Sequence, residues 1–186
     1  MFEEHTETVE ELIIAYELEQ HIEGGFFRQV YVSPKMVEIP QADGSVLTLP
    51  DSTRIYFLLN STDFSAFHRL ALSEEKWVFQ QSSEEDHSVL IIHEIKEDGT
   101  LISHWLGDPL KNSDAKKEII IPKGSWFSAE IKCPDNTSFV LTICEVTPGF
   151  TDEQFELANR EALIKAFPQH AALIGRLTRT DKEEKI

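Results

Sequence analysis

The sequence has few cysteines, few basic residues and no long apolar segment. Its 186 residues include only two cysteines, Cys133 and Cys144, which stand in neither a CxxC nor a Cys/His spacing. This argues against a disulfide framework and a structural zinc site. No apolar run reaches the roughly 18 to 20 residues of a membrane helix, so no membrane association is expected. The acidic start MFEEHTETVEEL lacks the basic and apolar regions of a secretory signal, and we expect a cytoplasmic protein.

Positive charge is scarce. The chain has 17 Lys and Arg against 33 Asp and Glu, which leaves a formal net charge of -16. Such a charge repels phosphate backbones, so nucleic acid is not an expected partner. Three catalytic signatures are also missing from the sequence, namely a glycine-rich phosphate loop, a G-x-S-x-G elbow and an H-E-x-x-H helix. Phosphoryl transfer, α/β-hydrolase chemistry and zincin proteolysis therefore lose support.

The length and composition predict one globular domain over residues 1–186, with its core at about 18–167. Thr8 and Glu11 have capping-box spacing before an apolar face with helical periodicity, which predicts a helix over residues 9–19. Paired glycines at 24 and 25 then precede a strand that ends before Pro34. Residues 35–51, with an Asp-Gly turn pair, are expected to form a hairpin or a surface loop.

Short apolar runs separated by turn residues follow. They lie at residues 54–60, 76–80, 88–95, 100–107, 117–122, 126–131 and 138–146. Runs at such intervals, joined by Gly, Pro, Asp and Asn, are typical of antiparallel sandwiches and barrels. The sequence therefore predicts a mainly β domain.

The C-terminal part is expected to be helical. Thr151 and Gln154 have capping-box spacing, and the pattern after them predicts a helix that ends at Pro168. A shorter helix is expected from Pro168 to about Leu177. The charged tail 178–186 has no apolar anchor, so we expect it to be frayed.

The densest group of chemically capable residues is AFHRLALSEEKWVF at 66–79, which holds His68 and Glu75. A histidine near a carboxylate can act as a general base, ligate a divalent metal or form a structural hydrogen-bonded pair. A second group, HIEGGFFR, places His21, Glu23 and Arg28 around two glycines. These residues can line a ligand site or form the salt-bridged rim of a turn.

Two further candidates are weaker on residue type alone. Trp126 begins a predicted strand and can either stack on a ligand ring or fill the core, which is the commoner role of an isolated tryptophan. Cys144 alternates along another strand, where a buried cysteine usually acts as a small hydrophobic residue rather than a nucleophile.

Several motifs in order resemble one known family. They are LEQHIEGGFFRQVY (18–31), RIYFLL (54–59), SAFHRL (65–70), Glu-x-Trp (75–77), LG (106–107), IPKGSWFSA (121–129) and CEVTPGF (144–150). Together they resemble the uncharacterised fifth cupin family (domain of unknown function 985), whose members are similar to the jelly-roll barrels of dTDP-sugar epimerases. The resemblance covers about residues 18–163. It implies a double-stranded β-helix, the cupin jelly-roll barrel, with an N-terminal helix and one or two C-terminal helices, and a homodimer.

The resemblance also implies a barrel pocket that draws on His21, Glu23, Arg28, Tyr56, His68, Glu75, Trp77 and Trp126. This sequence departs from the family at Val78, where members commonly carry a second histidine directly after the tryptophan. Metal-dependent cupins generally use a His-x-His pair, a Glu and a later His, whereas only His68 and Glu75 can be named here. We therefore expect no metal site and no cofactor.

Three alternatives remain open: two functions and a structural protein whose barrel is filled and binds no ligand. The first is a metal-independent isomerase or epimerase of a carbohydrate, such as a nucleotide sugar, with His68 as base, Glu75 as its orienting partner and Tyr56 as acid. The second is a non-catalytic small-molecule-binding protein in which Trp77 and Trp126 stack on a ring and polar groups are held by Arg28 and Glu23. Fold alone does not choose between them.

Overall fold

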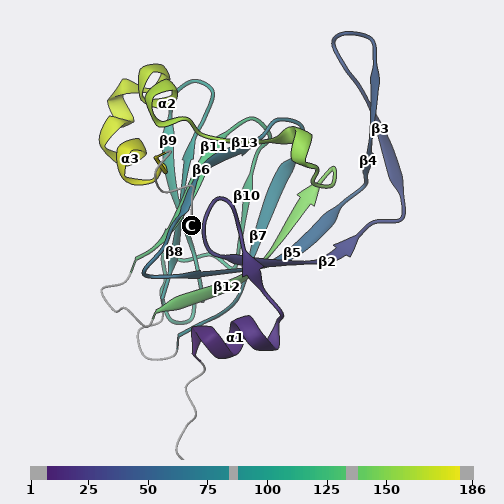
Figure 1. Cartoon of the computed structure of the whole chain (residues 1–186). Coiled ribbons are helices and arrows are strands. Elements are labelled where there is room, and N and C mark those ends of the chain that lie inside the picture. The colour runs from purple at the N-terminus through teal and green to yellow at the C-terminus, as the bar shows by residue number, and fades with distance from the viewer. Residues whose placement is uncertain (1–7, 84–87, 133–137, 181–186) are drawn as a thin grey trace, which may run out of the picture.

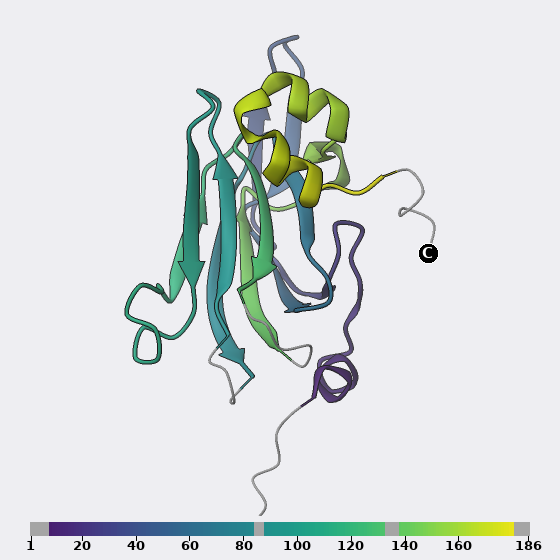
Figure 2. The same ribbon diagram turned by 90° about the vertical axis from the view of Figure 1, so that its left-hand side faces the viewer.

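Two antiparallel sheets face each other in the computed structural model, which describes residues 8–83, 88–132 and 138–180 (Figures 1 and 2). The first sheet has the order β1 (Glu19–Gln20), β2 (Phe26–Val32), β5 (Thr53–Asn60), β12 (Phe139–Thr147), β7 (Glu74–Ser82) and β10 (Glu118–Ile121). The second has the order β13 (Phe155–Leu157), β6 (Ser65–Leu70), β11 (Trp126–Ile131), β8 (Leu90–Ile95) and β9 (Leu101–Leu106). Every strand pair within these sheets is antiparallel.

The mainly β prediction is confirmed, and the arrangement is that of a cupin jelly roll. Over the described residues, however, the two sheets do not close into a barrel. The main core lies between the sheets, where Phe57 and Trp77 of the first meet Leu90, Ile92 and Phe127 of the second. Because side chains alternate across a strand, each strand sends every second residue into this interior.

The N-terminal helix is shorter than the sequence predicts. Helix α1 (Val9–Ala15) begins with the predicted capping box, in which the Glu11 N–H donates to Thr8 Oγ1 at 3.3 Å and the Thr8 N–H donates to Glu11 Oε2 at 2.9 Å. Beyond Ala15 the chain leaves the helix, because Glu17 adopts a left-handed φ of 52° and β1 begins at Glu19. Buried Leu12 attaches α1 to the outer face of the first sheet.

The predicted hairpin is present. Strands β3 (Met36–Pro40) and β4 (Val46–Pro50) pair around the Asp-Gly turn and extend away from the two sheets (Figure 1). In the part of the chain that the structure describes, every helix is too short or too polar to span a membrane.

The helix expected to begin at Thr151 is replaced by three elements. A 3-10 turn, η1 (Asp152–Gln154), leads into β13, and only then does α2 (Arg160–Ala166) begin, capped by Asn159 Oδ1, which accepts from the Ala162 N–H at 3.0 Å. The reason is tertiary: Gln154 is buried, where it accepts from Ser73 Oγ and donates to the Gly149 carbonyl.

The second predicted C-terminal helix is present as η2 (Pro168–His170) and α3 (Ala171–Arg176). The start of the tail is held rather than frayed, because Thr178 is buried and Arg179 is bound to three other residues. Residues 181–186 of the predicted frayed tail lie outside the described residues.

Candidate functional site

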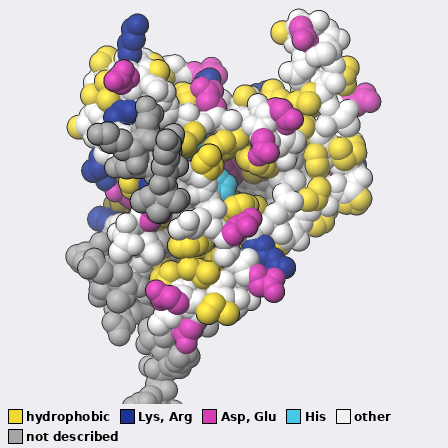
Figure 3. Space-filling view, viewed as in Figure 1, with side chains coloured by type: hydrophobic (Ala, Val, Ile, Leu, Met, Phe, Trp, Pro, Cys, Tyr) yellow, Lys and Arg dark blue, Asp and Glu magenta, His cyan; other side chains and the backbone are white. Residues whose placement is uncertain are grey.

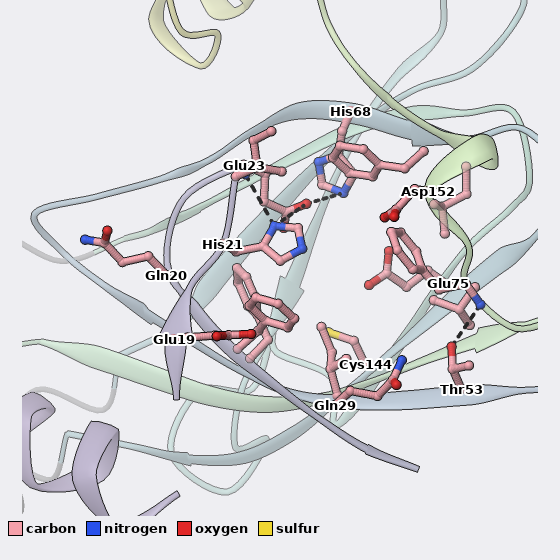
Figure 4. A pocket seen from close by; sticks show the side chains of 18 residues that line it. Glu19, Gln20, His21, Glu23, Gln29, Thr53, His68, Glu75, Cys144 and Asp152 are labelled. Carbon is pink, nitrogen blue, oxygen red and sulfur yellow. Dashed lines mark hydrogen bonds and ion pairs between the residues drawn. The ribbon is translucent and has the colours of Figure 1, made fainter. Parts of the chain in front are cut away.

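A cavity of about 680 Å³ opens at one end of the space between the sheets. Figure 3 shows a histidine side chain inside a hollow on this face. The walls are formed by seven strands (β1, β2, β5, β6, β7, β12 and β13), the turn η1 and two loops. The lining residues are Glu19, Gln20, His21, Ile22, Glu23, Phe27, Gln29, Thr53, Ile55, Phe57, His68, Leu70, Glu75, Cys144, Val146, Phe150, Asp152 and Phe155. The lining combines apolar and aromatic side chains with polar groups; in Figure 4 His21, Glu23 and His68 lie close together, and Glu75 and Asp152 lie across the cavity from His21.

His68 and Glu23 share a proton on one wall. His68 Nδ1 lies 2.7 Å from the Ala66 carbonyl, which can only accept, so Nδ1 carries the ring proton. His68 Nε2 then faces Glu23 Oε2 at 3.2 Å without a proton of its own. Burial lowers the pKa of His68 to about 3, against the Ala66 hydrogen bond, and nearby His21 lowers it further. The ring is therefore neutral at pH 7.

Glu23 supplies the missing proton. Burial and the charge of Glu75 raise its pKa well above the ordinary value, although the Ser65 hydroxyl and Arg179 act in the opposite direction. The Ser65 hydroxyl donates to Glu23 Oε1 at 3.0 Å, which leaves Oε2 to carry the proton. Glu23 is thus a neutral acid whose O–H is aimed at His68 Nε2.

His21 lies beside the same carboxyl. Its Nδ1 accepts the Glu23 backbone N–H at 3.3 Å and stands 3.5 Å from Glu23 Oε2. Burial lowers the pKa of His21 to about 4, so the neutral ring carries its proton on Nε2. Figure 4 shows the His21 ring projecting into the cavity. A neutral imidazole N–H is therefore available to a ligand, with a protonated carboxyl behind it.

Glu75 occupies the other side of the cavity. Burial raises its pKa to about 7, an effect that a hydrogen bond from the Cys144 thiol partly offsets. Burial and the charge of Glu75 in turn raise the pKa of Cys144 well above its ordinary value, so Cys144 is a thiol at neutral pH and not an activated nucleophile. A carboxyl that titrates near pH 7 inside a cavity is suited to general-base catalysis.

The loop that carries His21 and Glu23 is held by backbone contacts that only glycine permits. Gly24 has a φ of 114° and Gly25 a φ of 70°, and the Gly25 N–H donates to Asp63 Oδ2 at 2.9 Å. A Cβ on Gly24 would lie 2.1 Å from the Phe64 carbonyl oxygen and 2.2 Å from an Arg179 nitrogen. The paired glycines noted in the sequence therefore bring the Glu23 carboxyl to His68.

Four of the eight residues expected at the pocket line the cavity: His21, Glu23, His68 and Glu75. The carboxyl beside His68 is Glu23 rather than Glu75, which corrects the expected pairing of His68 with Glu75. In the sequence these residues form two separate clusters, and only the family resemblance placed them in one pocket. The fold brings the two clusters together because the glycine loop crosses the end of β6.

The other four lie elsewhere. Tyr56 and Arg28 point away from the cavity, because they alternate with the lining residues of β5 and β2; Tyr56 packs on Tyr16, and Arg28 pairs with Glu17. Trp77 is fully buried in the main core, with its ring centroid 5.4 Å from that of Phe57. Trp126 packs toward the C-terminal helices, under the guanidinium of Arg69.

Further lining residues were missed. Gln29, Thr53 and Asp152 contribute polar groups to the cavity, and Phe57, Phe150 and Phe155 contribute aromatic ones. Alternation along the predicted strands could have found Gln29 and Phe57, once one inward position was known. Asp152 and Phe155 belong to the first part of the predicted helix, where η1 and β13 form instead. No set of three or more His, Cys, Asp or Glu side chains among the described residues is arranged to hold a metal ion.

The comparisons with known proteins agree with this architecture. Two facing antiparallel sheets with a cavity at one end are the architecture expected of the cupin class. The family model described as Cupin superfamily (DUF985) matches residues 10–158, and the chain belongs to this family. Among curated proteins, none gives a significant match.

Solved structures show the same fold. A Shewanella oneidensis protein is 35% identical with a TM-score of 0.78, over 94% of this chain and 99% of that one. A hypothetical protein from Leishmania major is 24% identical with a TM-score of 0.80, over 94% and 100% of the two chains. The capsular polysaccharide assembling protein CapF from Staphylococcus aureus is 12% identical with a TM-score of 0.50, over 75% and 31%. The last two likenesses concern the fold alone.

Proposed function

We propose that this cupin is a metal-independent isomerase or epimerase that moves a proton on a small carbohydrate bound in the cavity. The observation that carries the proposal is the pair of carboxyls with different protonation across one cavity. Glu23 is a neutral acid held between two histidines, whereas Glu75 titrates at about pH 7. Titratable groups whose environments separate their pKa values are the usual signature of an acid and a base.

Each residue then has a chemical role. The Glu75 carboxylate removes the proton from the carbon next to the substrate carbonyl, and the electron pair moves onto the carbonyl oxygen. His21 donates its Nε2 proton to that oxygen. In the same step the Glu23 O–H turns from His68 Nε2 to His21 Nδ1, 3.5 Å away, and Nδ1 releases the Glu23 backbone N–H to receive this proton. Reversal of these transfers at the neighbouring carbon, or on the other face of the same carbon, completes isomerisation or epimerisation. The atoms and charges balance without a cofactor.

The roles differ from those expected from the sequence. His68 cannot readily act as the base, because its Nε2 already accepts the Glu23 proton and its Nδ1 is bound to Ala66. We infer that His68 instead sets the position of the Glu23 proton. Tyr56, expected as the acid, lies outside the cavity lining, and His21 takes its place.

The test is solvent deuterium exchange. The protein is incubated in D₂O with reducing sugars, ketoses and keto sugars, free and nucleotide-linked, and the C–H signal beside the carbonyl is followed by NMR. We expect exchange that falls at least about 100-fold in Glu75→Gln and in His68→Asn, and that is unchanged in Arg28→Gln, a control on the outer face of β2. Binding of a sugar without exchange at any pH would contradict the proposal and support the non-catalytic binding function.

A further inference from the structure

The cavity walls carry negative charge without a compensating cation. Beside the neutral Glu23, three acidic residues line it: Glu19, Glu75 and Asp152. Among the described residues of the lining there is no lysine or arginine. Figure 4 shows Glu75 and Asp152 on the same side, with His21 and Glu23 opposite. Both histidines are neutral at pH 7, because burial lowers their pKa values, so they do not offset this charge.

The nearby cations are engaged elsewhere. Arg54 pairs with Glu145 on the outer face of the first sheet, Arg69 donates to Glu156 at 2.7 Å, and Arg179 donates to Asp63 at 2.8 Å behind the glycine loop. Arg28 pairs with Glu17. The strand alternation that sends Gln29 into the cavity sends Arg28 out of it. None of these arginines therefore offers a positive charge to an anionic ligand in the cavity.

A phosphate or carboxylate needs charged donors or a helix N-terminus when it is held in a site of low dielectric. This cavity offers neither among its described residues, and it places carboxyls where those donors would be required. Coulomb repulsion between like charges grows as water is excluded. An uncharged sugar meets no such penalty, and an ammonium group would gain a partner in Glu75 or Asp152 together with the aromatic faces of the walls.

We propose that the cavity selects by charge: it admits uncharged and amine-bearing ligands and excludes anionic ones. The substrate class that follows, an unphosphorylated neutral or amino sugar, rests on the proposed function. A nucleotide diphosphate would have to remain outside these walls. The charge selectivity itself is a property of the cavity and holds whether or not the protein is an enzyme.

The test uses reagents of opposite charge and similar size, and it does not depend on turnover. Gln29→Cys places a thiol on the cavity wall, and Val30→Cys, its exposed neighbour outside the lining, serves as the matched control. Each variant reacts with 2-aminoethyl or 2-sulfonatoethyl methanethiosulfonate. The thiolate attacks the sulfenyl sulfur, forms a mixed disulfide and releases methanesulfinate. Peptide mass spectrometry then gives the rate at the introduced cysteine, separately from Cys144.

We expect the ratio of cationic to anionic rates to be at least about tenfold larger at Gln29→Cys than at Val30→Cys, because charged walls focus the local field. The control removes the contribution of the overall net charge. Adding Glu75→Gln and Asp152→Asn should bring the two ratios together. Equal ratios in the two single variants would overturn the charge inference. Absence of deuterium exchange with every sugar would overturn the proposed function alone.

Discussion

Arg179 donates from Nε and Nη2 to the backbone carbonyl of Glu23, at 3.3 and 3.1 Å. The same guanidinium donates to Asp63 Oδ1 at 2.8 Å and to the Phe64 carbonyl at 2.9 Å. Arg179 thus joins the C-terminal segment to the loop that presents His21 and Glu23 to the cavity. The family match ends at residue 158, so a residue outside the matched region holds the candidate site in place.

Arg179→Met should therefore weaken both the fold and the site. The loss of several charge-assisted hydrogen bonds around a largely buried guanidinium should lower the free energy of unfolding by about 2 to 4 kcal/mol. Urea denaturation gives the measurement. Arg176→Met is the control, because Arg176 is half-exposed and its pairing with Glu130 should be worth about 1 kcal/mol or less. Equal losses in the two variants would contradict the anchoring role of Arg179.

Gly24→Ala should disrupt the same loop. Gly24 has a φ of 114°, and an added Cβ would lie 2.1 Å from the Phe64 carbonyl oxygen. Because this oxygen belongs to the backbone, it cannot move aside without a large cost in free energy. We expect a loss of about 3 kcal/mol in the free energy of unfolding. Gly44→Ala, at the hairpin turn with a φ of 84° and open space around it, should lose only about 1 kcal/mol. A small effect at Gly24 would argue against the tight loop.

Glu75→Gln should stabilise the protein at alkaline pH. Burial raises the pKa of Glu75 from its ordinary 4.5 to about 7, so the unfolded state loses this proton first as the pH rises. Ionisation of Glu75 does not affect the free energy of unfolding below pH 4.5. Between pH 4.5 and pH 7 it lowers this free energy increasingly, and above pH 7 the loss is about 3 kcal/mol. Removing the charge should raise the melting temperature at pH 8 but hardly at pH 4. A shift of the same size at both pH values would contradict the assigned pKa.

The rate of the proposed proton exchange should rise through about pH 7. Glu75 must be ionised to act as a base, and burial raises its pKa to about 7, so the rate should fall about tenfold for each pH unit below that value. The profile of kcat/KM against pH for any exchanged sugar gives the measurement. An ascending limb near pH 4 would exclude Glu75 as the base.

Tyr56→Phe should leave deuterium exchange within about twofold of the wild type. The side chain lies on the α1 side of β5, where its ring centroid is 4.9 Å from that of Tyr16, and it does not line the cavity. The exchange rate and the melting temperature are measured together. A loss of exchange without a loss of stability would restore Tyr56 as the acid.

The sequence by itself determined what depends on near neighbours along the chain. The capping box of Thr8 and Glu11, the Asp-Gly hairpin turn, the positions of most strands from β5 to β12 along the chain and the two glycines before β2 were all readable, because turns and alternating apolar runs act locally. The ordered motifs also placed His21, Glu23, His68 and Glu75 in one predicted pocket, and the structure brings these four residues to the cavity.

Only the tertiary structure decided which atoms meet. Tyr56 and Arg28 are excluded from the cavity by the alternation of side chains along their strands. The pairing of His68 with Glu23, and the hydrogen bond from Arg179 to the glycine loop, depend on contacts between segments far apart in the chain. Likewise, a capping-box pattern at Thr151 gave way to β13, because burying Gln154 and pairing Phe155 with Leu70 of β6 outweighed local helix preference. Local conformational preferences contribute less free energy than burial and hydrogen bonds between distant segments. The reactive groups of this cavity come from such distant segments, so their arrangement depends on the tertiary structure.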